Sequence, residues 1–237
     1  MKRFFAMGCF LLGVSLWAAN ADAQTTVDTN GTSGNGSSAG TWTGGVIPNN
    51  DGPTYDVQLS NTPCPVVISL DINATMDSPL IQNSSAVFPN SGTTLAVSGS
   101  VDNSGFLDTF GGARLNMGGS FTNEASGQPY LGGPGDTFSA DTLNNVASVY
   151  VRSGSTVSVG GSVDSSGARY TSGGTLTVGG SFTNEAGANL DLGNPGDIVN
   201  LRSLNNMGDP ASLFLFGTGF LAVAYITRRR FRFRVSN

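Results

Sequence analysis

The eight residues GGSFTNEA occur at Gly118–Ala125 and again, letter for letter, at Gly179–Ala186, 61 positions further along a chain of 237 residues. A catalytic motif is usually written once, because a site needs one copy of each group. Self-similarity at a fixed offset is instead the signature of a structural unit that stacks on copies of itself. The repeated phrase therefore points to architecture before chemistry.

The repetition extends well beyond these eight residues. Aligned at the same offset, residues 115–145 and 176–206 are identical at 17 of 31 positions. The identities include a Pro-Gly-Asp triplet at Pro134–Asp136 and Pro195–Asp197, and a Leu-Asn-Asn triplet at the end of each segment. Chance does not produce this agreement, so the offset is an internal period of the chain.

The 61-residue period divides into smaller units. Four segments share the frame apolar, x, apolar, x, Gly, Ser, apolar, x, Asn or Ser; they are 95–105, 115–127, 157–167 and 176–187. Their first residues lie 20, 42 and 19 positions apart, and the interval of 42 contains one further, degenerate unit around residues 143–154. One unit therefore corresponds to the shorter of these intervals, and three units make one period.

The spacing of apolar residues within a unit predicts the fold. Leu95 and Val97 alternate with polar residues, so both point to the same face of a strand. The glycine that follows permits a corner, and Val101 then returns an apolar side chain to the same interior. One unit cannot bury its own apolar face, but copies stacked ~4.8 Å apart make a continuous core. We predict an all-β fold, a β-helix or related β-solenoid of ~20-residue turns.

Two expectations distinguish this fold from a duplicated β-sandwich, in which each unit would be a hairpin. In a β-solenoid, Leu115 and Leu176 line one shared core, whereas in the sandwich they line separate sheets. Equivalent polar residues of successive units are also expected to form a side-chain ladder along one corner, namely Asn103, Asn123, Ser165 and Asn184.

The composition favours many short strands over helices. There are 34 glycines, no histidine and only 11% charged residues, so residues that favour helices are scarce. Residues 24–208 carry 14 acids and 4 arginines, a net charge of 4 − 14 = −10. This balance argues against nucleic acid as a partner, because phosphate binding needs clustered Lys and Arg. A solvated acidic surface is the prediction, and a cation-binding role is the alternative.

Residues 1–23 have the three parts of a secretory signal peptide. Lys2 and Arg3 supply the positive charge, and an apolar stretch follows from Phe4 to Trp17. Small residues at Ala21 and Ala23 predict cleavage before Gln24. The alternative is an uncleaved membrane anchor, for which the apolar stretch is short.

The mature chain divides into three parts by composition. Residues 24–40, rich in Gly, Ser and Thr, predict a flexible lead-in. Residues 41–93 are less regular and predict an N-terminal β cap, and residues 94–207 hold the repeats of the solenoid. The Trp, Gly-Gly, Pro-Asn-Asn and YDVQL run within 41–82 resembles the opening of repetitive bacterial surface proteins, including those with autotransporter-type β-repeats. In such folds this part caps the first turn and covers its sheet edges.

The C-terminal segment 208–237 predicts a membrane anchor. Residues 211–227 contain no charge, and at ~1.5 Å per residue a helix over them would be roughly 25 Å long, the short limit for a span. Arg228, Arg229 and Arg230 follow directly and would stay in the cytoplasm, leaving the preceding domain outside. The alternative is that residues 211–227 form a β-strand of the main domain. In that case the arginines that follow would have no partners in a packed interior.

A short proline-containing motif, one apolar span and a terminal arginine cluster together resemble the PEP-CTERM sorting signal. The family's Pro-Glu-Pro appears here as Gly208-Asp209-Pro210, in which Asp209 keeps the acid and Pro210 the last proline. The resemblance implies a Gram-negative bacterium that makes exopolysaccharide. It also implies processing by an exosortase, an integral membrane protease, as a partner. It covers roughly residues 208–234.

Several classes of chemistry are excluded by residue type. Without histidine there is no Ser-His-Asp or Cys-His nucleophile and no His-bound zinc, and without lysine in the mature chain there is no Schiff base. We therefore assign no catalytic, cofactor-binding or metal-ligating residue. A β-helix lyase or hydrolase using paired carboxylates is the alternative. Its candidates recur with the repeat, which favours turns or surface; they are Asp102, Glu124, Asp136, Asp164, Glu185 and Asp197. The Pro-Gly-Asp loops could bind calcium through carboxylate and carbonyl oxygens. We prefer the alternative that these residues form tight turns, in which Pro, Gly and Asp are common.

These features together predict an exported, non-enzymatic protein of the cell surface or extracellular matrix, associated with envelope polysaccharide and held by a C-terminal helix in the inner membrane. A carbohydrate-binding module is a further alternative and would need exposed aromatic side chains aligned on one face. The candidates are Tyr130, Tyr150 and Tyr170, with one turn in each three expected to present one.

Overall fold

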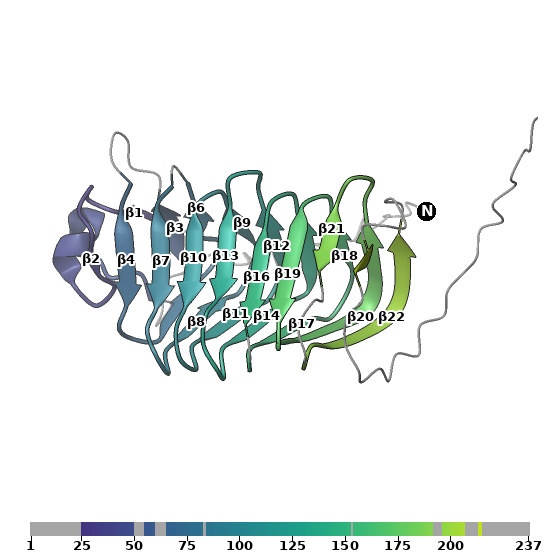
Figure 1. The fold of residues 1–237 in the computed structure, drawn as a ribbon. Helices are drawn as coiled ribbons and strands as arrows, with labels where there is room; N and C mark the ends of the chain where they lie inside the picture. The colour runs from purple at the N-terminus through teal and green to yellow at the C-terminus, as the bar shows by residue number, and fades with distance from the viewer. Residues whose placement is uncertain are drawn as a thin grey trace, which may run out of the picture.

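The structure, a computed structural model, describes residues 25–49, 55–59, 65–82, 84–152, 154–191, 196–206 and 213–214. The chain winds as a β-solenoid, in which successive coils add strands to three long faces (Figure 1). The strands of a face run parallel to one another. The predicted β-solenoid is therefore confirmed. The sandwich alternative is wrong, since hairpins would pair antiparallel strands.

The first face contains β1 (Thr25–Asp28), β3 (Tyr55–Leu59), β6 (Leu80–Ile81), β9 (Val101–Asn103), β12 (Ser120–Asn123), β15 (Thr142–Asn145) and β18 (Val163–Ser165). The second face contains β5 (Ala74–Met76), β8 (Thr94–Val97), β11 (Arg114–Met117), β14 (Thr137–Ala140) and β17 (Thr156–Val159). The long strands β20 (Thr175–Asn184) and β22 (Ile198–Asn206) pass around the corner, so they belong to both faces and join them into one 14-stranded sheet.

The third face is a separate nine-stranded sheet. Its strands are β2 (Gly34–Asn35), β4 (Val67–Leu70), β7 (Ala86–Pro89), β10 (Phe106–Thr109), β13 (Gln128–Leu131), β16 (Val149–Arg152), β19 (Ala168–Ser172), β21 (Asn189–Asp191) and β23 (Leu213–Phe214). Two 3-10 helices, η1 (Ala39–Thr41) and η2 (Thr43–Gly45), lie near the N-terminal end.

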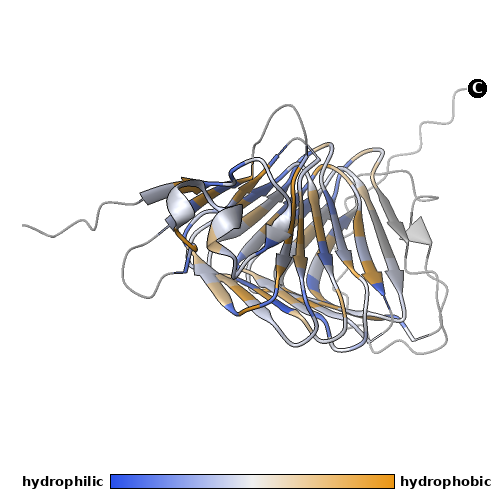
Figure 2. Cartoon of the chain, turned by 90° about the vertical axis from the view of Figure 1, so that its left-hand side faces the viewer, coloured by the Kyte–Doolittle hydropathy of each residue, from blue (hydrophilic) through white to orange (hydrophobic). Residues whose placement is uncertain are grey.

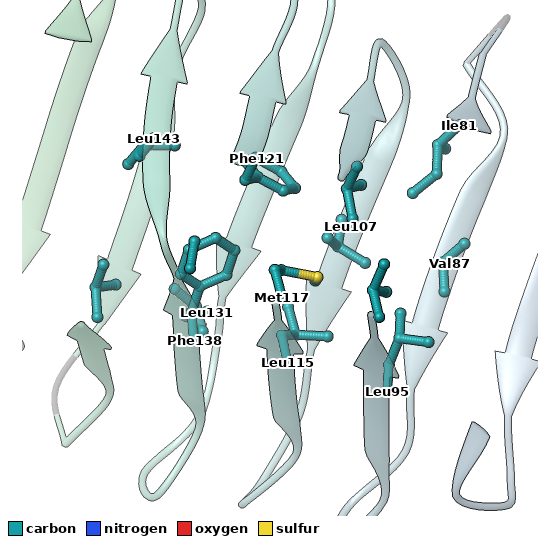
Figure 3. Close-up of a cluster of buried hydrophobic side chains, with 14 of the residues drawn as sticks. Ile81, Val87, Leu95, Leu107, Leu115, Met117, Phe121, Leu131, Phe138 and Leu143 are labelled. Atoms are coloured by element: carbon teal, nitrogen blue, oxygen red, sulfur yellow. The ribbon is translucent and has the colours of Figure 1, made fainter. Parts of the chain in front are cut away.

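Equivalent apolar residues of successive coils form columns inside the solenoid. On the second face one column runs through Leu95, Leu115, Phe138, Val157 and Leu176, each opposite the next in register. Leu115 is 1% exposed and Leu176 is 0% exposed, so both line one core, as the solenoid prediction required. Figure 3 shows three members of this column, Leu95, Leu115 and Phe138, together with side chains of the other faces such as Leu107 and Phe121. Figure 2 shows hydrophobic and hydrophilic residues alternating along the strands.

A second column on the first face contains the phenylalanine of the repeated phrase. Val101, Phe121 and Leu143 are consecutive members, and Phe182 occupies the same place three coils after Phe121. The rings of Phe121 and Phe138 form a T-shaped pair with 5.1 Å between centroids and an interplanar angle of 87°. Large and small side chains therefore interlock between neighbouring coils, which is what close packing requires.

The predicted polar ladder runs along one corner of the core. Asn103 Nδ2 donates to Asn123 Oδ1 at 3.0 Å, and Asn123 Nδ2 donates to Asn145 Oδ1 at 2.8 Å. Asn145 Nδ2 then donates to Ser165 Oγ at 3.1 Å. All four side chains are buried, and each hydrogen bond offsets the desolvation of an amide or hydroxyl group. Asn145, from the degenerate unit, is a ladder member that the repeat frame does not predict. The fourth predicted member, Asn184, lies opposite Ser165 in register, and its Nδ2 donates to Ala188 O at 3.3 Å.

The same corner explains a recurring glycine. Gly105 and Gly167 follow the ladder residues of their coils, and a Cβ at either position would collide with a backbone carbonyl of the preceding coil, Ser85 O or Ala147 O. Only a residue without a side chain lets the two backbones approach this closely. These two glycines are therefore required by the contact between coils.

The stack begins earlier in the chain than the composition predicts. Within the expected flexible lead-in, β1 pairs with β3 and β2 pairs with β4, so that part of the prediction is corrected. Strands β3 to β7 also belong to the common sheets, which places coils before residue 94. Trp42 is 2% exposed and donates its indole N–H to Gly36 O at 2.9 Å, which closes this end of the core. Pairing with the next coil outweighs the low strand propensity of Gly34 and Asn35 in β2.

The predicted C-terminal helix falls almost wholly outside the described residues. Within 211–227 only Leu213–Phe214 is described, and it forms β23, paired with β21, so these two residues correct the helix prediction. Their backbone pairs with Leu190 and Asp191 of the preceding coil, which accounts for the strand. Among the residues that the structure describes, no helix is long and apolar enough to cross a membrane.

Candidate functional site

The sequence candidates for sorting and export lie outside the described residues. This applies to the cleavage residues Ala21, Ala23 and Gln24, to the motif residues Asp209 and Pro210, and to the topology residues Arg228, Arg229 and Arg230.

The repeated acids are placed apart from one another. Asp102 and Asp164 lie exposed in one outward column of the first face, with Thr122 and Asn144 between them in register. Three steps of ~4.8 Å separate them by roughly 14 Å. The pairs Glu124 with Glu185 and Asp136 with Asp197 have the same three-coil separation. Glycosidases need their two carboxyl groups within about 5–9.5 Å, so none of these equivalent pairs has that geometry.

Asp136 of the Pro-Gly-Asp loop is buried, and its carboxylate is used in hydrogen bonds within the fold. It is 0% exposed, and its carboxylate accepts hydrogen bonds from the backbone N–H groups of Gly112, Ala113 and Gly133 at 2.7–3.0 Å. The hydroxyl of Thr109 donates to it at 2.8 Å. Gly112, Ala113 and Thr109 belong to the preceding coil, so the carboxylate fastens two coils together. In the equivalent loop, Asp197 accepts from the N–H groups of Gly173 and Gly174.

The outer side of the third face brings two of the three tyrosine candidates together. Tyr130 on β13 lies opposite Tyr150 on β16 in register, and the backbone of Tyr150 pairs with Tyr170 on β19. The rings of Tyr130 and Tyr150 are 6.0 Å apart between centroids and tilted by 51°. The expectation of one tyrosine in each three turns is corrected, because consecutive coils supply them.

A groove of about 790 Å³ opens over these tyrosines. Its walls come from four neighbouring strands of the third face and from the loop after β13. The side chains that line it and bear on its chemistry are Phe106, Asp108, Gln128, Tyr130, Tyr150 and Arg152. Aromatic rings, a carboxyl, an amide and a guanidinium therefore converge on one open surface. Such a mixture is typical of sites that bind an amphipathic ligand.

Two local features fix the position of Tyr130. The guanidinium carbon of Arg152 lies 5.0 Å from the centre of the Tyr130 ring, a cation–π contact. Gly132 lies beside the ring, and a Cβ at Gly132 would come within 2.7 Å of Tyr130 Cε1. The ring therefore occupies space that a side chain at position 132 would fill.

Asp108 lies in the same outward column, opposite Tyr130 on β13. Burial raises the pKa of its carboxyl from the usual 3.8 to about 6, because desolvation disfavours the charged form. Because of this raised pKa, Asp108 changes its charge under mildly acidic conditions. Arg152 supplies a positive charge to the same groove.

Replacing Asp108 by asparagine should stabilise the protein at neutral pH and change how its stability depends on pH. Between pH 3.8 and about 6 the folded protein binds more protons than the unfolded chain, so the free energy of unfolding falls as pH rises. We expect Asp108→Asn to be about 1 kcal/mol more stable than the parent at pH 7.5, allowing for partial solvation, and equal to it near pH 4. Urea unfolding at four pH values between 4 and 7.5 measures this.

Asp164→Asn, at an exposed position, is the matched control and should leave the pH profile of stability unchanged. A constant difference between Asp108→Asn and the parent across the pH range would show that the Asp108 carboxyl is not desolvated.

The two tyrosines of the groove were predictable from the sequence, whereas Phe106 and the polar side chains were not. Tyr130, Tyr150 and Tyr170 recur at equal intervals, which is a visible signal. Asp108 precedes Tyr130 by a slightly longer interval, and Arg152 has no counterpart in the repeat, so neither gave a signal. Within the described ranges no three Asp, Glu, Cys or His side chains gather as a metal site would need.

Searches against family models, curated proteins and solved structures found no match to this chain.

Proposed function

We propose that this chain is an exported, non-enzymatic rod of the bacterial envelope or extracellular matrix that associates with exopolysaccharide. The observation that carries the proposal is the uninterrupted parallel stack, whose core columns run from coil to coil without a break. Such a stack is stiff, because each coil is held to its neighbours by strand pairing, apolar packing and the asparagine ladder.

A structural role is also supported by the arrangement of the acids. The repeat-equivalent carboxylates are roughly 14 Å apart or are used within the fold, as Asp136 is. A glycoside hydrolase would need two carboxyl groups converging on one bond. The hydrolase alternative therefore has less support than the scaffold.

In this proposal the two ends of the chain determine where the protein is located. Residues 1–23 direct export and are removed before Gln24, and the apolar stretch that follows β23 anchors the protein in the inner membrane. Arg228, Arg229 and Arg230 keep the C-terminus in the cytoplasm. An exosortase-like protease would then act near Asp209 and Pro210 and release the rod to the surface or matrix.

Cell fractionation of a Gram-negative host that carries an exosortase tests this function. The full chain is compared with an Asp209→Ala, Pro210→Ala double variant and with the control Asp164→Ala. We expect the parent and the control in the surface or matrix fraction, with a mature N-terminus at Gln24, and the double variant in the inner membrane.

Two outcomes would contradict the proposal. Identical fractions for the parent and the double variant would remove the sorting step. A full-length, unprocessed parent chain in the cytoplasm would remove export altogether.

A further inference from the structure

We propose that the groove over Tyr130 and Tyr150 binds a neutral polysaccharide whose sugar rings stack on the two tyrosines along the solenoid axis. This inference rests on the proposed association with exopolysaccharide and names its site and ligand class. It is carried by the geometry of the tyrosine column, the polar groups around it and the charge of the domain.

The tyrosine column has the geometry for stacking a chain of sugars. Tyr130 and Tyr150 lie in register on adjacent parallel strands, with 6.0 Å between ring centroids. Both side chains are partly exposed and line the groove. The apolar C–H faces of a pyranose ring carry partial positive charge and complement the negative face of an aromatic ring. A ligand that contacts both rings must cross the strands, and therefore runs along the axis.

The groups beside the rings match sugar hydroxyls. Asp108 lies one strand before Tyr130 in the same column, and its carboxyl can accept hydrogen bonds from hydroxyl groups. The Gln128 amide both donates and accepts, and the Arg152 guanidinium donates. Arg152 is held over the Tyr130 ring, so its orientation is set before a ligand arrives. Hydrogen-bond donors and acceptors therefore lie beside the tyrosine rings. This arrangement matches a sugar, whose hydroxyl groups surround its apolar C–H face.

The charge of the domain favours a neutral glycan over an acidic one. Residues 24–208 carry a net charge of −10, which repels a polyanion at long range. Arg152 is the only cationic side chain among the groove residues named above, and Asp108 lies in the same groove. An anionic polysaccharide would meet one guanidinium and a carboxylate within an acidic rod. A neutral chain meets no such penalty.

Binding measurements on the purified full chain test the site. The protein is kept in a detergent without a sugar headgroup, because a glucoside or maltoside would compete for the groove. The probes are soluble β-1,4-glucan, β-1,3-glucan, galactomannan and dextran, with alginate as the acidic probe. We expect at least one neutral probe to bind by calorimetry and alginate to bind more weakly.

The groove variants are Tyr130→Ala, Tyr150→Ala and their combination, with circular dichroism confirming that each is folded. Each single change should weaken binding about tenfold, and the double change should abolish it. Tyr130→Phe keeps the ring and should stay within about threefold of the parent. Phe110→Ala removes an aromatic ring that is 50% exposed and does not line the groove, and it should have no effect.

Several results would overturn the inference. They are the absence of binding to every neutral probe, full binding by the double variant, and stronger binding to alginate. Self-association of the parent that the double variant abolishes, seen by sedimentation, would instead show that the groove holds a second copy of the chain. The proposed function fails separately: a chain that binds neutral glycan through its tyrosines but is never exported keeps the site and loses the matrix role.

Discussion

Replacing Asp136 by alanine is expected to destabilise the solenoid by about 3–5 kcal/mol. The carboxylate is fully buried and accepts hydrogen bonds from three backbone N–H groups and the Thr109 hydroxyl. Alanine would leave these donors without their acceptor, and each unsatisfied buried donor costs about 1–3 kcal/mol, partly offset where water enters. Chemical unfolding of the full chain, followed by circular dichroism, measures the loss.

Two matched variants sharpen this test. Asp136→Asn keeps one carbonyl acceptor and should lose roughly half as much stability as Asp136→Ala. Asp164→Ala removes an exposed repeat acid and should change stability by less than about 0.5 kcal/mol. Equal effects of Asp136→Ala and Asp164→Ala would show that the buried carboxylate does not fasten the coils.

Replacing Phe121 by alanine is expected to cost about 3–5 kcal/mol. The ring is 0% exposed and packs edge-on against Phe138, 5.1 Å away between centroids. The rigid coils on both sides are held by strand pairing and cannot collapse into the space, so a cavity remains. Because solenoids unfold by coils and not always in one step, hydrogen exchange is the sharper measurement. Faster exchange should be centred on β9, β12 and β15.

Phe110→Ala is the control for the same chemical change at a surface position. Phe110 is 50% exposed, and its ring is tilted by 49° against that of Phe88 with 6.0 Å between ring centroids, so we expect a loss below about 1 kcal/mol. A small and evenly spread effect of Phe121→Ala would contradict the continuous core that the columns describe.

The core columns and the corner ladder were largely predictable, because both follow from residues that repeat. Leu115 and Leu176 were expected in one core and lie in one column. The ladder was expected through Asn103, Asn123, Ser165 and Asn184; hydrogen bonds join the first three through Asn145, and Asn184 continues the column opposite Ser165 in register. Asn145 was missed because its unit is one residue shorter between its second and third apolar positions, Ala140 and Leu143, and lacks the Gly-Ser pair there, although its Leu-Asn-Asn triplet is shared with Leu204–Asn206.

The N-terminal coils show the limit of composition as a guide. A Gly-, Ser- and Thr-rich segment lacks an apolar pattern, and flexibility was the expectation for residues 24–40. In the structure β1 and β2 are held by backbone hydrogen bonds to the next coil, which do not depend on side-chain type. Pairing of this kind leaves little trace in the sequence.

By itself the sequence determined the class of fold, the length of the unit, the residues that face the core and the absence of histidine chemistry. These follow from the period of the apolar residues and from which residue types are present. Only the tertiary structure decided which outward side chains meet. The interval from Asp108 to Tyr130 differs from that between Tyr130 and Tyr150, because the coils differ in length at their corners, and strand register alone brings these three into one column. The Arg152 contact with Tyr130 and the buried hydrogen bonds of Asp136 arise in the same way. Each joins residues of neighbouring coils whose register cannot be read from the sequence.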